Sequence, residues 1–176
     1  MKLSTRARYG LRMMVELSRE LREVELVQLG KIARITGLSE NYLAQLAIPL
    51  KSSGLLIGVS GKNGGYKLSR PAASITIREI VESVIGPMNL TDCIENPDIC
   101  MNSSFCETRM IWAILSGLMT ETLEKYSLED LIDKERTDEI RKEYAHMPLL
   151  YPDRIMSGAA DMEESGCPTK INSKIR

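Results

Sequence analysis

The order of elements between residues 28 and 68 constrains the fold of this 176-residue chain more than any other feature. Two short amphipathic helices are predicted around a turn at Thr36-Gly37, and Ser39 is placed to cap the second helix. A β-rich run from Leu55 to Val59 follows, and SGKNGG supplies turn residues before a second strand at Tyr66-Lys67-Leu68. Helix, turn, helix and hairpin in this order predict a winged helix-turn-helix domain.

Apolar residues at helical spacing predict which faces of the helices are buried. In the second short helix these are Leu43, Leu46, Ala47 and Leu50, and in the first they are Leu29, Ile32 and Ala33. A longer helix from Thr5 to Leu21 is predicted to bury one stripe: Ala7, Leu11, Met14, Val15, Ser18 and Leu21. The second short helix keeps polar residues outside, near its N-terminal end, where helix-turn-helix proteins read bases.

Charge is divided unequally along the chain. Residues 1–80 hold 13 Lys and Arg against 6 Asp and Glu, whereas residues 81–176 hold 10 against 18. A basic first half indicates a polyanion partner, with an accidental asymmetry of solvated faces as the alternative. The candidates for base edges are Ser39, Asn41 and Gln45. The candidates for contacts to the DNA backbone or the minor groove are Arg6, Arg8, Tyr42, Lys51, Lys62, Asn63 and Lys67.

A loop after the winged helix contains Cys93, Cys100 and Cys106, separated by six and then five residues rich in Asn, Pro, Asp and Ser. No apolar run approaches the length of a membrane span, and the N-terminus lacks the apolar core of a signal peptide. We therefore expect a cytoplasmic protein that does not bind membranes. In that reducing compartment, clustered cysteines indicate metal or redox chemistry rather than disulfides.

Two helices flank this loop in the prediction. Thr76 and Glu79 form a capping box that starts a short linking helix, and Gly86-Pro87 ends it. From about Thr108 to Tyr126 runs a long helix whose apolar residues cover more than one face. Burial of that surface against a partner subunit is the economical explanation, and burial within one domain is the weaker alternative.

Four stretches carry a resemblance to a known family: MKLSTRARYGLRMM, GLSENYLAQL, LKSSGLL with GKNGGYKLSR, and SLEDLI. Over roughly residues 1–132 the chain resembles the Rrf-type winged-helix regulators, the family of IscR, NsrR and CymR. The resemblance implies a homodimer that reads a roughly palindromic operator in double-stranded DNA. It also implies an iron–sulfur cluster held by Cys93, Cys100 and Cys106, since CymR-type members lack these cysteines.

The fourth ligand departs from the family pattern. Arg109 stands where IscR-type members have a His, and Arg8 stands where NsrR-type members have an Asp. Arginine stays protonated and cannot be a ligand. The remaining candidates are a solvent or small-molecule ligand and the side chains of Glu107, Asp92, Asp98 and the distant Cys167. The sequence does not decide between a [2Fe–2S] and a [4Fe–4S] cluster.

The predicted fold class is mainly α with a small β-hairpin wing, a winged helix-turn-helix domain followed by a long dimerisation helix. Four segments are expected: a DNA-binding domain over 1–72, a linker helix and cysteine loop over 73–106, the dimerisation helix and short helices over 107–145, and a disordered tail over 146–176. The predicted function is transcriptional regulation under cluster control. The alternatives are a regulator with a thiol-redox or zinc switch, and an iron–sulfur carrier or electron-transfer protein. No catalytic motif is evident, so we expect no enzyme.

Overall fold

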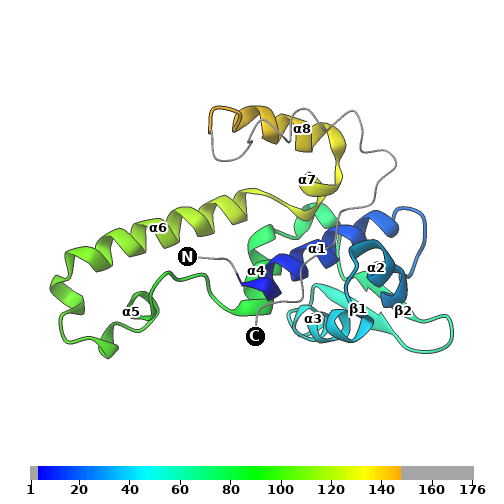
Figure 1. Cartoon of the computed structure of the whole chain (residues 1–176), viewed down its shortest axis with the longest axis horizontal. Helices are drawn as coiled ribbons and strands as arrows, with labels where there is room; N and C mark the ends of the chain where they lie inside the picture. Colours follow the sequence, from blue (N-terminus) through cyan, green and yellow to red (C-terminus); the bar gives the residue numbers. More distant parts are fainter. Residues whose placement is uncertain (1–3, 148–176) are drawn as a thin grey trace, which may run out of the picture. The chain divides into compact units, whose positions relative to one another are not determined.

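The computed structural model describes residues 4–147, which belong to two compact units divided after Asp133. The predicted fold class is confirmed, because the chain is mainly helical with one two-stranded hairpin (Figure 1). The predicted tail from 146 lies almost wholly outside the described residues. The first unit contains α1 (Thr5–Glu20), α2 (Leu29–Thr36), α3 (Glu40–Ser52), β1 (Leu56–Val59), β2 (Gly65–Leu68), α4 (Ile77–Ile85), α5 (Asp92–Glu95), α6 (Glu107–Lys125), α7 (Leu128–Ile132) and three short 3₁₀ turns. The second unit contains α8 (Lys134–Glu143).

The helix-turn-helix forms as the sequence predicts. Gly37 ends α2 with a φ of 71°, a left-handed conformation that glycine adopts without strain. The Ser39 hydroxyl accepts a hydrogen bond from the Tyr42 N–H at 3.2 Å and so caps α3. The four predicted inward residues of α3 are buried. In α2, Ile32 is buried, whereas Leu29 and Ala33 are half-buried against the core.

The wing is an antiparallel hairpin in which Leu56 pairs with Leu68 and Val59 with Gly65. A third segment, missed by the sequence reasoning, joins it. The Val27 N–H donates to the Tyr66 carbonyl at 3.0 Å, and the Tyr66 N–H donates to the Val27 carbonyl at 2.8 Å. These two bonds join the half of β2 nearer the wing tip to the segment that leads into α2.

Helix α1 packs against α4, and also contacts α2, α3 and α7 (Figure 1). The closest approach is at Gly10, where an added Cβ atom would lie 2.9 Å from Val84 Cγ2. The predicted stripe of α1 is therefore turned slightly. Ala7, Met14 and Ser18 are buried as predicted, but three predicted residues are only half-buried and their places are taken by others. The half-buried residues are Leu11, Val15 and Leu21, and the additional buried ones are Gly10, Met13 and Leu17.

Two capping boxes fix the ends of neighbouring helices. The predicted box of Thr76 and Glu79 at the start of α4 is confirmed, and Ser127 forms a second box with Asp130 at the start of α7. The two caps lie side by side, since the backbones of Thr76 and Ser127 form an antiparallel bridge.

Partial burial raises the pKa of Glu79, but hydrogen bonds from Arg70 and the Thr76 N–H outweigh this and leave the pKa lowered.

No helix within residues 4–147 combines the length and the apolar content needed to cross a bilayer.

The close α1–α4 contact predicts whether the substitution Gly10→Ala stabilises or destabilises the protein. Replacing Gly10 with Ala should lower the free energy of unfolding by about 1–3 kcal/mol, because the new methyl group overpacks against Val84. The same change in an open helix interior would instead stabilise by roughly 0.5–1 kcal/mol. Urea unfolding of Gly10→Ala, Val84→Ala and the double variant measures the effect, and Val84→Ala should rescue part of the Gly10→Ala loss. A more stable Gly10→Ala protein would contradict the close packing.

Candidate nucleic-acid interface and cysteine loop

The exposed face of α3 carries two of the predicted base-reading residues. Asn41 and Gln45 are exposed and lie four residues apart, on the side opposite the buried residues. The Ser39 hydroxyl is engaged as the cap of the helix. The ring of Tyr42 packs edge-on against the ring of Tyr9 in α1, with centroids 6.0 Å apart and planes at 89°. This pair connects the first turn of α3 to α1.

The predicted phosphate contacts share one electrostatic property: none forms an ion pair with another residue in the described part of the chain. These cations are Arg6, Arg8, Lys51, Lys62 and Lys67. By contrast, Arg19, Arg22, Lys31, Arg70 and Arg78 of the same basic half are all paired with carboxylates. The unpaired cations therefore hold charge available to an external polyanion.

These cations come from α1, α3 and the wing, and Lys51 is exposed in the last turn of α3. Arg6 and Arg8 are exposed near the start of α1, and the guanidinium of Arg8 lies 5.6 Å from the centre of the Tyr9 ring. Lys62 is exposed at the tip of the wing beside Asn63, and Lys67 pairs with Ile57 in the hairpin. The tip turns at Gly61, whose φ is 119°.

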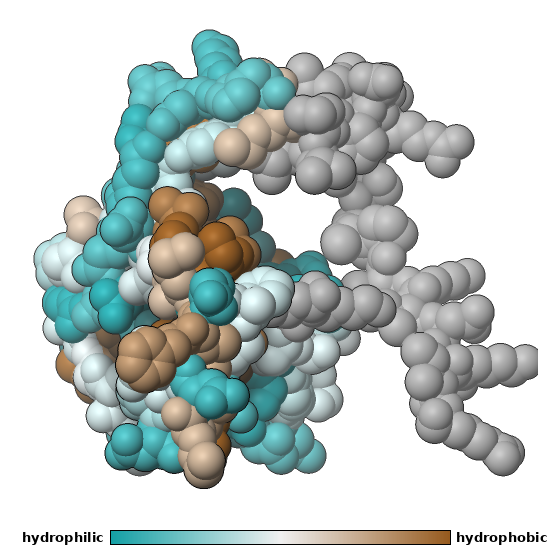
Figure 2. Space-filling model, turned by 90° about the vertical axis from the view of Figure 1, so that its left-hand side faces the viewer, coloured by the Kyte–Doolittle hydropathy of each residue, from teal (hydrophilic) through white to brown (hydrophobic). Residues whose placement is uncertain are grey.

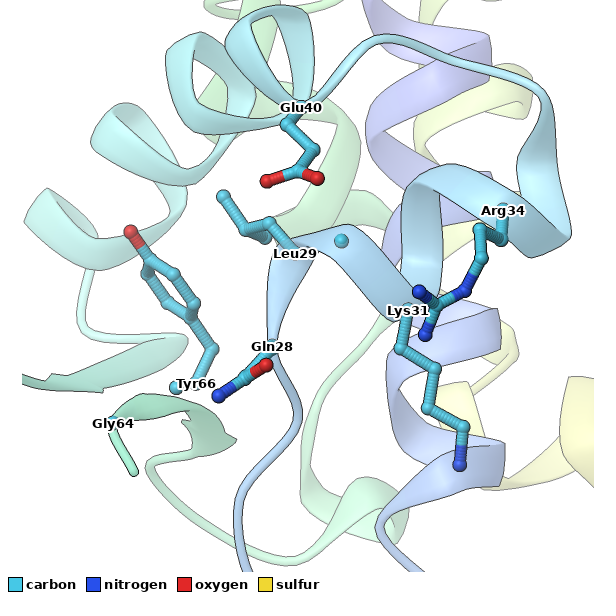
Figure 3. A pocket seen from close by; sticks show the side chains of 9 residues that line it. Gln28, Leu29, Lys31, Arg34, Glu40, Gly64 and Tyr66 are labelled. Carbon is cyan, nitrogen blue, oxygen red and sulfur yellow. The ribbon is translucent and has the colours of Figure 1, made fainter. Parts of the chain in front are cut away.

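A polar pocket of about 410 Å³ lies where α2, the start of α3 and the wing meet (Figure 3). Figure 3 shows the Glu40 carboxylate reaching from the start of α3 toward Leu29 and α2. A Cβ atom at Gly30 would lie 2.8 Å from Glu40 Oε1, so Gly30 gives this carboxylate its space. Glu40 is exposed, as the sequence predicts for the outer face of the second short helix. The pocket itself was missed, because it needs the wing to fold back beside α2.

The cysteine segment is less irregular than the sequence predicts. Cys93 lies within α5, Cys100 follows a 3₁₀ turn at Pro97–Ile99, and Cys106 is the N-cap residue of α6. All three are free thiols. Neither α5 nor the two 3₁₀ turns of this segment contain a buried residue, so little apolar packing holds the segment in one conformation.

Arg109 joins two parts of this segment. Its Nε donates to the Cys93 carbonyl at 2.9 Å, and its Nη1 donates to the Ser103 carbonyl at 3.4 Å. Arg109 therefore connects the backbone around Cys93 with that around Ser103. The sequence reasoning excluded Arg109 as a ligand but did not anticipate this role.

The three thiols and the candidate acids do not converge on one point. Within residues 4–147 no three His, Cys, Asp or Glu side chains are gathered closely enough to hold a metal ion. Asp92, Asp98 and Glu107 thus stay candidates by chemistry alone. Cys167 lies outside the described residues.

One thiol is activated by its surroundings. The Thr108 hydroxyl, 3.1 Å from the Cys106 sulfur, and then the backbone N–H of Arg109 lower the pKa of the Cys106 thiol. The N-cap position adds to this, since the start of a helix favours an anion. The surroundings of Cys106 therefore shift this thiol toward the thiolate, the form that binds metals and reacts with oxidants.

Helix α6 exposes a broad apolar surface. Among its described residues only Ser116 is buried, and its hydroxyl accepts from the Leu90 N–H at 3.0 Å. Exposed fractions are 57% for Met110, 50% for Ile111, 41% for Trp112, 52% for Ile114, 40% for Leu115 and 54% for Leu118. Figure 2 looks onto the side where α5 and the start of α6 lie in Figure 1, and apolar side chains gather there. Within residues 4–147 the rest of the domain leaves these side chains exposed.

Comparison with known proteins decides the family. The sequence profile of Rrf2, described as an iron-dependent transcriptional regulator, matches residues 3–134. The chain belongs to the Rrf2 family. The fold agrees, since the winged helix-turn-helix and the basic unpaired side chains are what a DNA-binding regulator of this family requires.

Relatives in the Rrf2 family include two kinds of regulator. CymR of Bacillus subtilis is 34% identical, over 74% of this chain and 89% of its own length, and IscR of Cereibacter sphaeroides is 35% identical, over 77% and 89%. The solved structure of B. subtilis CymR, described as the global cysteine regulator, has a TM-score of 0.61 at 33% identity and covers 75% of this chain and 96% of that one. T. potens IscR has a TM-score of 0.61 at 30% identity and covers 75% and 86%. The relatives are named as transcriptional regulators, and the family leaves the role of the three cysteines to be argued from this chain.

The environment of Cys106 gives a prediction of pH dependence. A lowered thiol pKa means that Cys106 is alkylated at lower pH, and loss of the Thr108 hydroxyl should move the midpoint of that pH profile upward. Metal-free protein would be treated with iodoacetamide across pH, and the modified peptide quantified by mass spectrometry in the wild type and in Thr108→Val. Thr91→Val is the matched control, because it removes a hydroxyl beside Cys93 instead. Equal midpoints in the wild type and Thr108→Val would refute the assigned cause.

Proposed function

We propose that this chain is a homodimeric, cytoplasmic transcriptional regulator that reads a roughly palindromic operator and whose DNA affinity is controlled by an iron–sulfur cluster on Cys93, Cys100 and Cys106. One observation carries the proposal. Three free thiols lie in a single loop without buried residues, directly between a helix packed on the DNA-binding domain and a helix with an uncovered apolar face.

The DNA-binding part rests on α3 and the unpaired cations. Asn41 and Gln45 present amide groups of the kind that pair with adenine in the major groove. Arg6, Arg8 and Lys51 would contact phosphates. The contact would extend along the wing through Lys62, Asn63 and Lys67. The ring of Tyr42 packs on Tyr9, and its hydroxyl would contact the DNA backbone.

Dimerisation rests on α6. Six apolar side chains of this helix are at least 40% exposed in the single chain, and their burial against a second copy would remove them from water. A two-fold symmetric pair would also set two copies of α3 about one turn of DNA apart, which suits a palindromic operator.

Three cysteine thiols suit an iron–sulfur cluster chemically, but the loop would have to bring them together to bind it. Thiolates are the usual protein ligands of iron in such clusters, and Cys106 already has a lowered thiol pKa. A bound cluster would supply a redox-active iron centre. The protein side of the site would be three cysteines, with Asp92, Asp98 or Glu107 or an exogenous ligand as the fourth. Arg109 would hold the backbone of the loop and place positive charge beside the thiolates.

A second candidate function is a thiol-redox or zinc switch on the same cysteines. The lowered thiol pKa of Cys106 and the separated positions of the thiols favour the redox form, because an oxidant can act on one thiol without three sulfurs converging beforehand. A zinc switch would need the ligands to converge, as a cluster would. Both candidates use the same winged helix, and they differ in metal content.

Metal composition separates these candidates. The chain purified without oxygen should show visible charge-transfer bands, with iron and acid-labile sulfide in near-equal amounts. Cys93→Ala, Cys100→Ala and Cys106→Ala should each lose the bands, whereas Ser104→Ala, a change in the same loop that removes no thiol, should keep them. A colourless protein with zinc or with free thiols would contradict the cluster and favour the switch. Bands retained in all three loop variants would place the ligands elsewhere.

A further inference from the structure

Ile48 in α3 is exposed without an evident structural reason. Its exposed fraction is 65%, higher than that of any other large apolar side chain in residues 4–85; Ile57 and Val24 follow at 42% and 41%. A β-branched residue has a slightly lower helix propensity than an unbranched one, and at this exposure it gains little from burial. Neither the core nor the helix accounts for an isoleucine here.

The neighbours of Ile48 argue against a protein-docking surface. On the surface of the helix it is flanked by Ala44 and Gln45 on one side and by Lys51 and Ser52 on the other, at i±3 and i±4. Such a setting holds one apolar side chain among small, polar and basic ones. The apolar surface of α6, in contrast, has six large side chains together.

Ile48 belongs instead to the reading face of α3. Asn41, Gln45 and Ile48 are spaced at i, i+4 and i+7 and are all exposed, opposite the buried Leu43 and Leu50. An apolar residue in line with two amides is therefore presented to whatever those amides contact.

We infer that Ile48 is a specificity-determining residue that packs against the 5-methyl group of a thymine in the major groove. This inference rests on the proposed reading of DNA by α3. The thymine methyl is the apolar group that base pairs present in the major groove, and it distinguishes T·A from the other pairs. Gln45 and Ile48 are separated by about 4.5 Å along the helix axis, so the thymine should lie about one or two base pairs from the base that Gln45 reads.

The test removes the methyl group from the DNA and the side chain from the protein. The full chain, purified without oxygen, would first select its operator from random duplexes. Each thymine of that operator would then be replaced by deoxyuridine, which lacks only the methyl group. At one thymine in each half-site, replacement by deoxyuridine should lower the affinity of the wild type about fourfold. Ile48→Ala should bind the thymine and the deoxyuridine operators with equal affinity. Ile35→Ala, the same change at an exposed position of α2, should keep the wild-type profile.

The outcomes separate this inference from the function on which it rests. If the wild type selects an operator but its deoxyuridine profile equals that of Ile48→Ala, Ile48 reads no methyl group and the inference is wrong. If the wild type selects no sequence, the DNA-binding proposal fails and this inference fails with it. A thymine whose methyl matters only when Ile48 is present establishes the contact. Far-UV circular dichroism confirms that the variants are folded.

Discussion

Close packing of α1 on α4 joins the two parts of the chain on which function would depend. Because Gly10 has no side chain, Val84 packs so close that an added Cβ atom would lie 2.9 Å from Val84 Cγ2. Helix α1 also contacts α2 and α3. On the other side α4 contacts α6, whose first residues follow the last cysteine. The elements between the cysteine loop and the reading helix are thus in continuous contact. Two discrete packings of this series would be needed for a cluster to change DNA affinity.

Unpaired cations and clustered exposed apolar side chains lie on different elements of the chain. Five cations of residues 4–80 are paired with carboxylates: Arg19, Arg22, Lys31, Arg70 and Arg78. Those at the start of α1, at the end of α3 and on the wing, together with Arg12 and Arg34, form no ion pair among the described residues. Exposed apolar residues gather on α6 instead. The two proposed partners, a polyanion and a second copy of the chain, would then contact different elements. The winged helix exposes only scattered apolar side chains, and Ile48, the most exposed of them, lies on the polar reading face of α3.

The sequence predicted the fold where local chemistry determines it. Gly37, Ser39 and the capping box at Thr76 act through their immediate neighbours, and all were confirmed. The features that the sequence did not predict depend on contacts between distant segments. They are the bridge from Val27 to the wing, the rotated buried face of α1 that includes Gly10, and the hydrogen bond from Arg109 to the loop backbone. The assignments of DNA contacts and metal ligands stay predictions, because they concern partners that the chain alone does not contain.

The most direct test of the account is operator affinity measured on one preparation in two states. Protein purified without oxygen would be titrated against its operator as isolated, and again after its metal has been removed by a chelator under reducing conditions. The account predicts that affinity changes by about tenfold or more, a coupling of about 1.4 kcal/mol, and that the change disappears in Cys106→Ala. Equal affinities in both states would contradict control by a metal cluster on the cysteine loop while leaving the winged helix as a DNA-binding domain.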